Sequence, residues 1–66
     1  APHEQLSDRE FEVFKMIVMG KSISEIGEIL SLNVNTISTY RARIMDKMKL
    51  HTNADLVKYA IQNNLV

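Results

Sequence analysis

The apolar residues of this 66-residue chain recur every three or four positions, which is the period of a helix with one buried side, rather than every second position. The pattern predicts an all-α fold, a compact four-helix domain with helices at about residues 8–19, 23–30, 34–49 and 53–63. The predicted buried positions of the first two helices are Phe11, Val13, Phe14, Ile17 and Val18, followed by Ile23, Ile26, Ile29 and Leu30.

Polar residues that commonly cap helices stand where the first two helices begin. Ser7 and Glu10 have the spacing of a capping box, in which each side chain accepts a hydrogen bond from the backbone N–H of the other residue. Ser22 and Glu25 repeat this spacing before the second helix. Gly20 lies between them and is expected to end the first helix, because glycine adopts the left-handed conformation without a steric penalty.

The third predicted helix, which Asn33 can cap, has two contrasting sides. At 100° per residue, its apolar side consists of Ile37, Ile44 and Met48, flanked by Tyr40 and Met45. Its opposite side contains Asn35, Ser38, Thr39, Ala42 and Asp46. All four methionines, which are Met16, Met19, Met45 and Met48, have helical spacing and are predicted to fill the core.

The second and third helices are separated only by residues 31–33, which indicates a helix-turn-helix over about residues 21–40. Gly27 in the middle of the second helix provides the small residue that is needed where two helix backbones cross closely. Ser31 stands in the turn at a position where glycine is common. A helix held in this way fits the DNA major groove and reads base edges with the exposed side of its N-terminal half.

This exposed side predicts base contacts by Asn35, Ser38, Thr39 and Ala42, because Asn can pair with adenine and Thr or Ala methyl groups can contact thymine. The formal net charge is zero, but residues 33–51 contain four of the eight Lys and Arg residues and a single acidic residue. We therefore expect phosphate contacts from Thr36, Tyr40, Arg41, Arg43, Lys47 and Lys49. Arg41 lies near the apolar side and is expected to reach a phosphate or a carboxylate at the edge of the core.

Several other functional classes are disfavoured by the composition. The chain has no cysteine, and its longest apolar run, Met16 to Met19, is far too short to cross a membrane. His51 has no metal-ligating partner at a suitable spacing, and neither has His3, which lies in an N-terminal segment without periodicity. We interpret that segment, residues 1–5, as a flexible linker stub. We expect a cytoplasmic protein that is not an enzyme and has no metal, cofactor or membrane partner.

Four motifs together resemble the LuxR-type DNA-binding domain, which forms the C-terminal half of NarL/FixJ response regulators. They are Leu6-Ser7-x-Arg9-Glu10-x-Glu12-Val13, Gly20-x-Ser22-x-x-Glu25-Ile26, Leu32-x-x-x-Thr36-Ile37 and Ile44-x-x-Lys47-Met48, and the resemblance covers about residues 6–60. The run Ser38-Thr39-Tyr40-Arg41 is similar to the BvgA-like branch, in which Tyr replaces the commoner His. In the wider family a Lys often stands at the position of Ser38, and this departure bears on which bases are read.

The resemblance implies that residues 6–66 form the output domain of a bacterial two-component response regulator that controls transcription. It implies that the third helix enters the major groove of double-stranded DNA, and that the fourth helix forms a homodimer contact. A preceding receiver domain and RNA polymerase are the further partners implied. The fourth helix is consistent with a dimer, because Ala54, Val57 and Ile61 widen the apolar side formed by Leu56, Tyr59 and Ala60. The absence of a starting Met fits an excised domain, or a short natural protein whose Met is removed.

Two alternatives remain open from the residues alone. The helices could form a protein-interaction module that uses the apolar side of the fourth helix, which the zero net charge favours. The short polar side chains of the third helix argue against it, because protein-binding surfaces favour large aromatic anchors. A sigma-factor-like promoter module uses a similar helix-turn-helix, but the motif from Leu6 to Glu12 points away from it.

Overall fold

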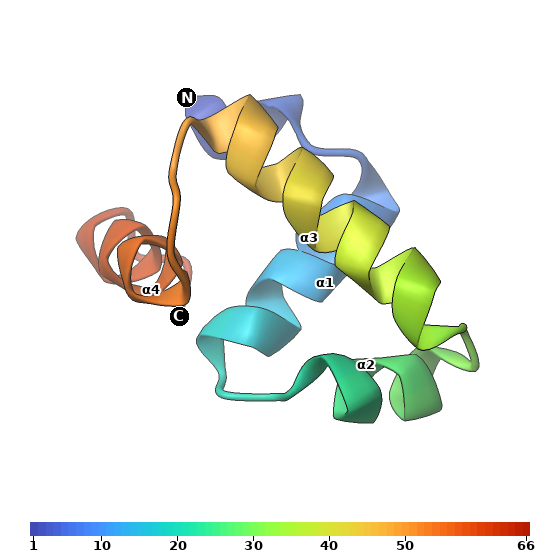
Figure 1. Cartoon of the computed structure of the whole chain (residues 1–66). Helices are drawn as coiled ribbons and strands as arrows, with labels where there is room; N and C mark the ends of the chain where they lie inside the picture. The colour runs from blue at the N-terminus through green and yellow to red at the C-terminus, as the bar shows by residue number, and fades with distance from the viewer.

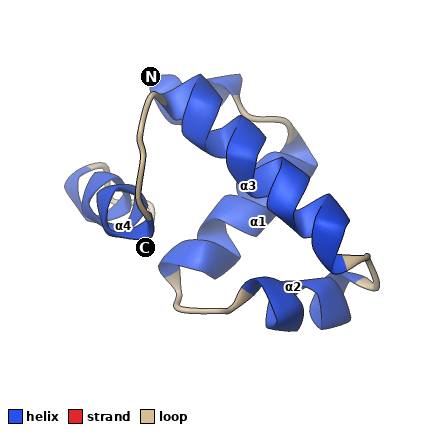
Figure 2. Cartoon of the chain, viewed as in Figure 1, coloured by secondary structure: helices blue, strands red, loops and turns tan.

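The computed structural model describes residues 1–66 and contains four α-helices: α1 (Asp8–Val18), α2 (Ile23–Leu30), α3 (Val34–Met48) and α4 (Asn53–Gln62) (Figure 1). A short 3₁₀ turn, η1 (Pro2–Gln5), precedes them, and no segment forms a strand (Figure 2). The predicted all-α fold is confirmed, and the predicted helix ends lie within one residue of those observed. None of the helices combines the length and apolar character required to cross a bilayer.

The helix starts follow the local hydrogen bonds that the sequence predicts. The Ser7 hydroxyl accepts from the Glu10 backbone N–H at 3.1 Å, and the Glu10 carboxylate accepts from the Ser7 N–H at 2.8 Å. Ser22 and Glu25 form the same reciprocal pair at 3.1 and 2.9 Å. Each pair satisfies two backbone donors that the first turn of a helix leaves without a partner. The predicted cap of α3 by Asn33 is confirmed as well, and Thr52 caps α4 by accepting from the Asp55 N–H.

One apolar core joins all four helices. α1 packs against α3 on one side and α4 on another, while α2 packs mainly against α3. In Figure 1, α3 crosses in front of α1, with α2 below it and α4 at the left. The buried apolar residues are Val13, Phe14, Ile17, Ile26, Ile37, Ile44, Met48, Leu56 and Ala60. They include Ile44 and Met48, which were predicted to lie beside Ile37 on the apolar side of α3.

Two residues that were predicted to be buried lie at the surface instead. Ile29 is 53% exposed, because α2 has only two turns and packs along the narrow stripe that contains Ile26. Met19 is 69% exposed, because it follows the last residue of α1 and is no longer on its buried side. Met48 is buried as predicted, while Met16 and Met45 are half-buried against the core.

The N-terminal segment is folded onto the domain, although its sequence shows no periodicity. The Nδ1 atom of His3 lies 2.7 Å from the hydroxyl oxygen of Tyr59 on α4, and the backbone N–H of His3 donates to the same oxygen at 3.3 Å. The His3 ring also lies 6.3 Å from the ring of Phe11, centroid to centroid. Residues 1–5, which we interpreted as a linker stub, thus form a 3₁₀ turn that contacts α1 and α4.

Candidate nucleic-acid interface

The close crossing of α2 and α3 depends on Gly27. A Cβ atom at this position would lie 2.8 Å from the backbone oxygen of Leu32 in the turn, which is closer than real Cβ contacts allow. The Leu32 N–H donates to the carbonyl oxygen of Gly27 at 2.9 Å and so ties the turn to α2. Ser31 adopts a left-handed conformation with φ of 57°, which explains why glycine is common there. The role predicted for Gly27 is confirmed.

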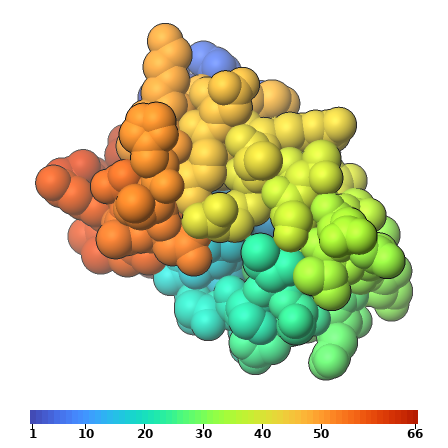
Figure 3. All heavy atoms as spheres, in the orientation of Figure 1, coloured from blue at the N-terminus to red at the C-terminus, as the bar shows by residue number.

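The N-terminal half of α3 presents an uncovered strip of short side chains. Asn35, Ser38, Thr39 and Ala42 are all exposed, on the side of the helix that lies opposite the buried Ile37. Figure 3 shows α3, in yellow to light green, uncovered across the front of the molecule. The four residues that were predicted to contact bases therefore lie on the exposed side of α3, as the helical periodicity indicates. None of the four is charged.

The hydrogen bonds within this strip restrict what it can offer. The Thr39 hydroxyl donates to the backbone oxygen of Asn35 at 3.0 Å, one turn earlier. The Asn35 backbone N–H donates to the side-chain oxygen of Asn33 at 2.7 Å, which caps the helix. Ser38 makes no such bond. In this strip the Thr39 hydroxyl already donates a hydrogen bond, whereas the side chains of Asn35 and Ser38 are free to donate or to accept.

The sides of the strip are formed by Thr36, Tyr40 and Arg41, which are all half-buried. The Nε atom of Arg41 donates to the side-chain oxygen of Asn53, the first residue of α4, at 2.9 Å. The acceptor within the chain is therefore an amide oxygen and not the carboxylate that was one of the two expected partners, while the phosphate contact of Arg41 stays a prediction. This bond joins α3 directly to the start of α4.

The far end of α3 is held by an ion pair that the sequence does not reveal. The ammonium group of Lys47 lies 2.7 Å from a carboxylate oxygen of Glu10, which is 3% exposed, whereas the Lys47 side chain is 38% exposed. Burial acts to raise the pKa of Glu10, but hydrogen bonds from Lys47 and from the Ser7 N–H outweigh it and keep the pKa below its usual value. Glu10 therefore links the cap of α1 to α3.

The remaining basic residues of the segment are exposed and form no ion pair. Arg43 lies in the middle of α3, and Lys49 follows its end in a left-handed conformation with φ of 57°. Neither is within salt-bridge distance of a carboxylate, so both cations are available to a ligand. His51 is exposed nearby, and no three side chains of the metal-ligating types gather anywhere in the chain.

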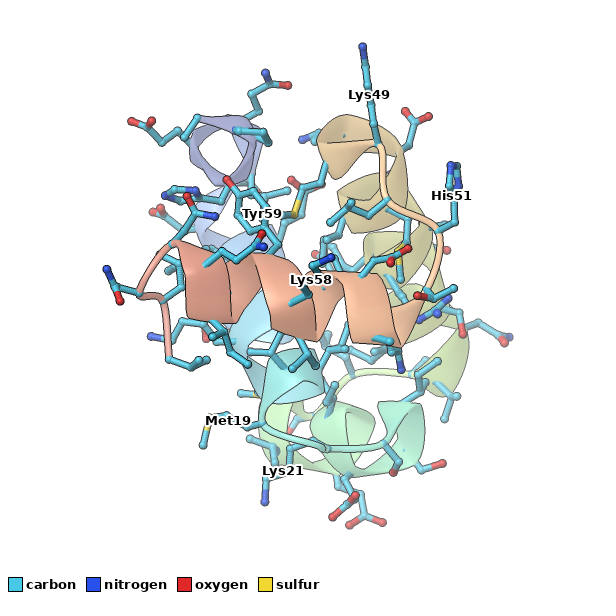
Figure 4. The ribbon with its side chains drawn as sticks, turned by 90° about the vertical axis from the view of Figure 1, so that its left-hand side faces the viewer. Met19, Lys21, Lys49, His51, Lys58 and Tyr59 are labelled. Carbon is cyan, nitrogen blue, oxygen red and sulfur yellow. The ribbon has the colours of Figure 1, made fainter.

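The outer side of α4 is apolar and uncovered. Leu56 and Ala60 are buried against the core, whereas Ala54 and Ile61 are exposed and Val57 is half-buried. A shallow hollow runs along the helix and is lined by Ala54, Val57, Lys58, Ile61 and Gln62. Figure 4 looks onto α4 and shows Lys58 on its outer surface. The predicted widening of the apolar side beyond the core is confirmed.

Comparison with known proteins places this arrangement in a family. The family model described as bacterial regulatory proteins, luxR family, matches residues 4–60. The chain is 35% identical over 65 residues to the response regulator UvrY of Escherichia coli strain K12. It is 37% identical over 65 residues to the transcriptional regulatory protein LiaR of Bacillus subtilis strain 168, and 35% identical to the oxygen regulatory protein NreC of Staphylococcus carnosus strain TM300.

Each of these alignments covers 98% of this chain but only 30 or 31% of the relative, so the chain spans about a third of the length of the curated relatives it matches. The resemblance inferred from the motifs is confirmed, while the BvgA-like branch stays a prediction. The chain belongs to the luxR family of bacterial regulatory proteins.

Proposed function

We propose that the chain binds duplex DNA with sequence preference by inserting the N-terminal half of α3 into the major groove. The uncovered, uncharged strip on α3 carries this proposal. An α-helix fits the major groove, and the small Ala42 side chain lets the helix lie deep enough for Asn35, Ser38 and Thr39 to reach base edges. Because Gly27 fixes the crossing of α2 and α3, the strip is held outward before any DNA arrives.

The phosphate contacts in this proposal come from the rim of the strip. Arg43 and Lys49 are exposed cations without a partner, so they can reach the backbone without breaking an existing bond. Thr36, Tyr40 and Arg41 lie at the half-buried sides of α3, where polar groups meet a groove wall. Lys47 has three N–H donors and uses one for Glu10, which leaves two for a phosphate.

We further propose that two copies of the chain pair through the outer side of α4. Ala54, Val57 and Ile61 form an apolar side on which Ala54 and Ile61 are exposed and Val57 is half-buried. A two-fold pair would place two α3 helices about one turn of DNA apart, over an inverted repeat with centres about 10 bp apart.

The relatives suggest the larger setting. UvrY is named a response regulator, and the relatives are about three times as long as this chain. We propose that the chain is the output domain of a bacterial two-component response regulator in the cytoplasm, with a receiver domain on its N-terminal side and RNA polymerase as a further partner. In this proposal the chain acts by binding and not as an enzyme.

Selection from a pool of random duplex DNA tests the proposal. Recovery of an enriched inverted repeat with half-sites about 10 bp apart would support both α3 reading and α4 pairing. Enrichment of single half-sites would support α3 reading and contradict pairing by the isolated chain. The absence of enrichment and of binding at low salt would contradict DNA binding, and would favour a protein partner of α4.

The salt dependence of binding separates phosphate contacts from base contacts. Replacement of Lys49 by Ala should weaken binding to all sequences and lower the slope of log affinity against log salt by about one unit. Lys15→Ala is the matched control, because Lys15 is exposed on α1, which lies behind α3 in Figure 1. An unchanged slope for Lys49→Ala would remove Lys49 from the proposed set.

A further inference from the structure

The hydroxyl proton of Thr39 is already used within α3. Its oxygen lies 3.0 Å from the carbonyl oxygen of Asn35 and donates to it. A hydroxyl has one proton and two lone pairs, so Thr39 can accept another hydrogen bond but cannot donate one while this bond persists. The bond also holds the β-branched side chain in one rotamer, which fixes the position of its methyl group. Thr39 therefore offers a base an acceptor and a methyl group.

The strip residues around Thr39 lack the groups that usually recognise guanine, and the exposed Arg43, one turn beyond Thr39, is assigned to a phosphate in the proposed function. Arg or Lys contacts to O6 and N7 of guanine are the commonest specific contacts in the major groove. In residues 34–42 the only cation is Arg41, which is half-buried and donates through Nε to Asn53. The exposed neighbours Asn35, Ser38 and Ala42 carry no charge. The Thr39 hydroxyl cannot donate to N7 or O6 of guanine, and no cation on this strip can donate in its place.

We infer that Thr39 is a specificity-determining residue that selects an A·T pair. Its methyl group packs against the C5-methyl group of thymine, and its oxygen accepts from the N6 amino group of adenine. Guanine presents only the acceptors N7 and O6 at its major-groove edge, and these would face the lone pairs of the Thr39 oxygen. Cytosine has an amino donor but no methyl group. The inference rests on the proposed entry of α3 into the major groove, and it adds the base pair and the atoms that are read.

The test uses the enriched site from the random pool and the 66-residue chain. The position read by Thr39 is the one at which Thr39→Ala relaxes the base preference. Four duplexes are then compared at this position, with T·A, deoxyuridine·A, C·G or G·C. Deoxyuridine differs from thymidine only in lacking the C5-methyl group, so the difference in affinity between the T·A and deoxyuridine·A duplexes measures the methyl contact.

Two variants separate the methyl group from the hydroxyl. Removal of the thymine methyl should weaken binding of the wild-type chain about fourfold, the effect of uncovering one buried apolar carbon. Thr39→Val, which keeps a methyl group at the same branch, should show a similar loss. Thr39→Ser, which keeps only the hydroxyl, should bind both duplexes equally. Lys15→Ala on α1 is the control and should keep the wild-type ratio. Since Thr39 is exposed, these variants should fold, and circular dichroism melts check this.

The outcomes distinguish this inference from the proposed function. A preference for G·C at the position, an equal loss in the wild type and Thr39→Ser, or a failure of Thr39→Ala to relax any position would overturn the inference and leave DNA reading by α3 intact. If the wild-type chain enriches no sequence at all, the inference and the proposed function both fall.

Discussion

Replacement of Lys47 by Met should destabilise the fold through Glu10. The substitution keeps the length of the side chain but removes the cation 2.7 Å from a carboxylate that is 3% exposed. Removing one partner of a fully buried ion pair costs about 3–5 kcal/mol. Lys47 is 38% exposed, and a domain with a radius of gyration of 10.8 Å keeps water close to the pair, so screening reduces the cost. We expect a loss of about 2 kcal/mol in the free energy of unfolding.

That loss is measurable by thermal unfolding. For a domain of this length, 1 kcal/mol corresponds to about 4–8 °C in Tm, so Lys47→Met should melt about 8–16 °C below the wild type. Glu10→Gln should cost less, because the amide oxygen can still accept from the Ser7 N–H and from Lys47. Lys58→Met is the matched control: Lys58 is exposed and unpaired, so its replacement should change stability by less than about 0.5 kcal/mol.

The pH dependence provides a second measurement of the same pair. The pKa of Glu10 is lower in the folded chain than its ordinary value of 4.5. The stabilisation that ionised Glu10 adds to the free energy of unfolding is therefore fully present above pH 4.5, and it is lost as the pH falls through the folded pKa. The stability difference between the wild type and Glu10→Gln should therefore narrow below about pH 4.5. The lowered pKa of Glu25 is common to both proteins and cancels in the difference. Equal melting of Lys47→Met and the wild type at neutral pH would show that the ion pair between Lys47 and Glu10 does not stabilise the fold.

Three further changes test the crossing, the turn and the pairing surface. Gly27→Ala should cost about 2 kcal/mol in urea unfolding, because the new Cβ would meet the Leu32 oxygen and this outweighs the better helix propensity of Ala; unchanged stability would show that the turn can move. Ser31→Gly should add about 0.5–1 kcal/mol in the same assay, since φ is 57° there, and a loss would contradict this. Val57→Glu should weaken binding to inverted repeats but not to single half-sites, with little change in Tm; a large fall in Tm would show that Val57 belongs to the core.

The features that could be predicted from the sequence are those set by neighbours along the chain. Capping boxes join residues three positions apart, and the exposed strip of α3 follows from helical periodicity. Lys47 and Glu10 are 37 residues apart, and His3 and Tyr59 are 56 apart, so neither contact has a local signal. The prediction that Ile29 is buried was wrong for a related reason. Periodicity places Ile29 on the apolar side of α2, but only the packing of α2 against its neighbours decides how much of that side is covered.

The contacts that position α3 in the fold lie apart from the residues of α3 that are proposed to contact bases. Lys47 fixes its far end to α1, Arg41 fixes its middle to α4, and the crossing at Gly27 fixes its start to α2. Each of these contacts lies outside the strip that contains Ser38 and the other proposed base contacts. DNA binding therefore does not require the fold to give up a contact, except where Lys47 or Arg41 shares its donors with a phosphate.

The bond between Arg41 and Asn53 has a further consequence. It joins the helix that is proposed to read DNA to the first residue of the helix that is proposed to pair two chains. A shift of α4 on pairing would thus act on the angle of α3 through this bond as well as through the shared core. Asn53→Ala, which removes the acceptor from an exposed residue, should broaden the half-site spacing recovered in selection while it leaves each half-site unchanged. Unaltered spacing would show that core packing alone sets the angle between α3 and α4.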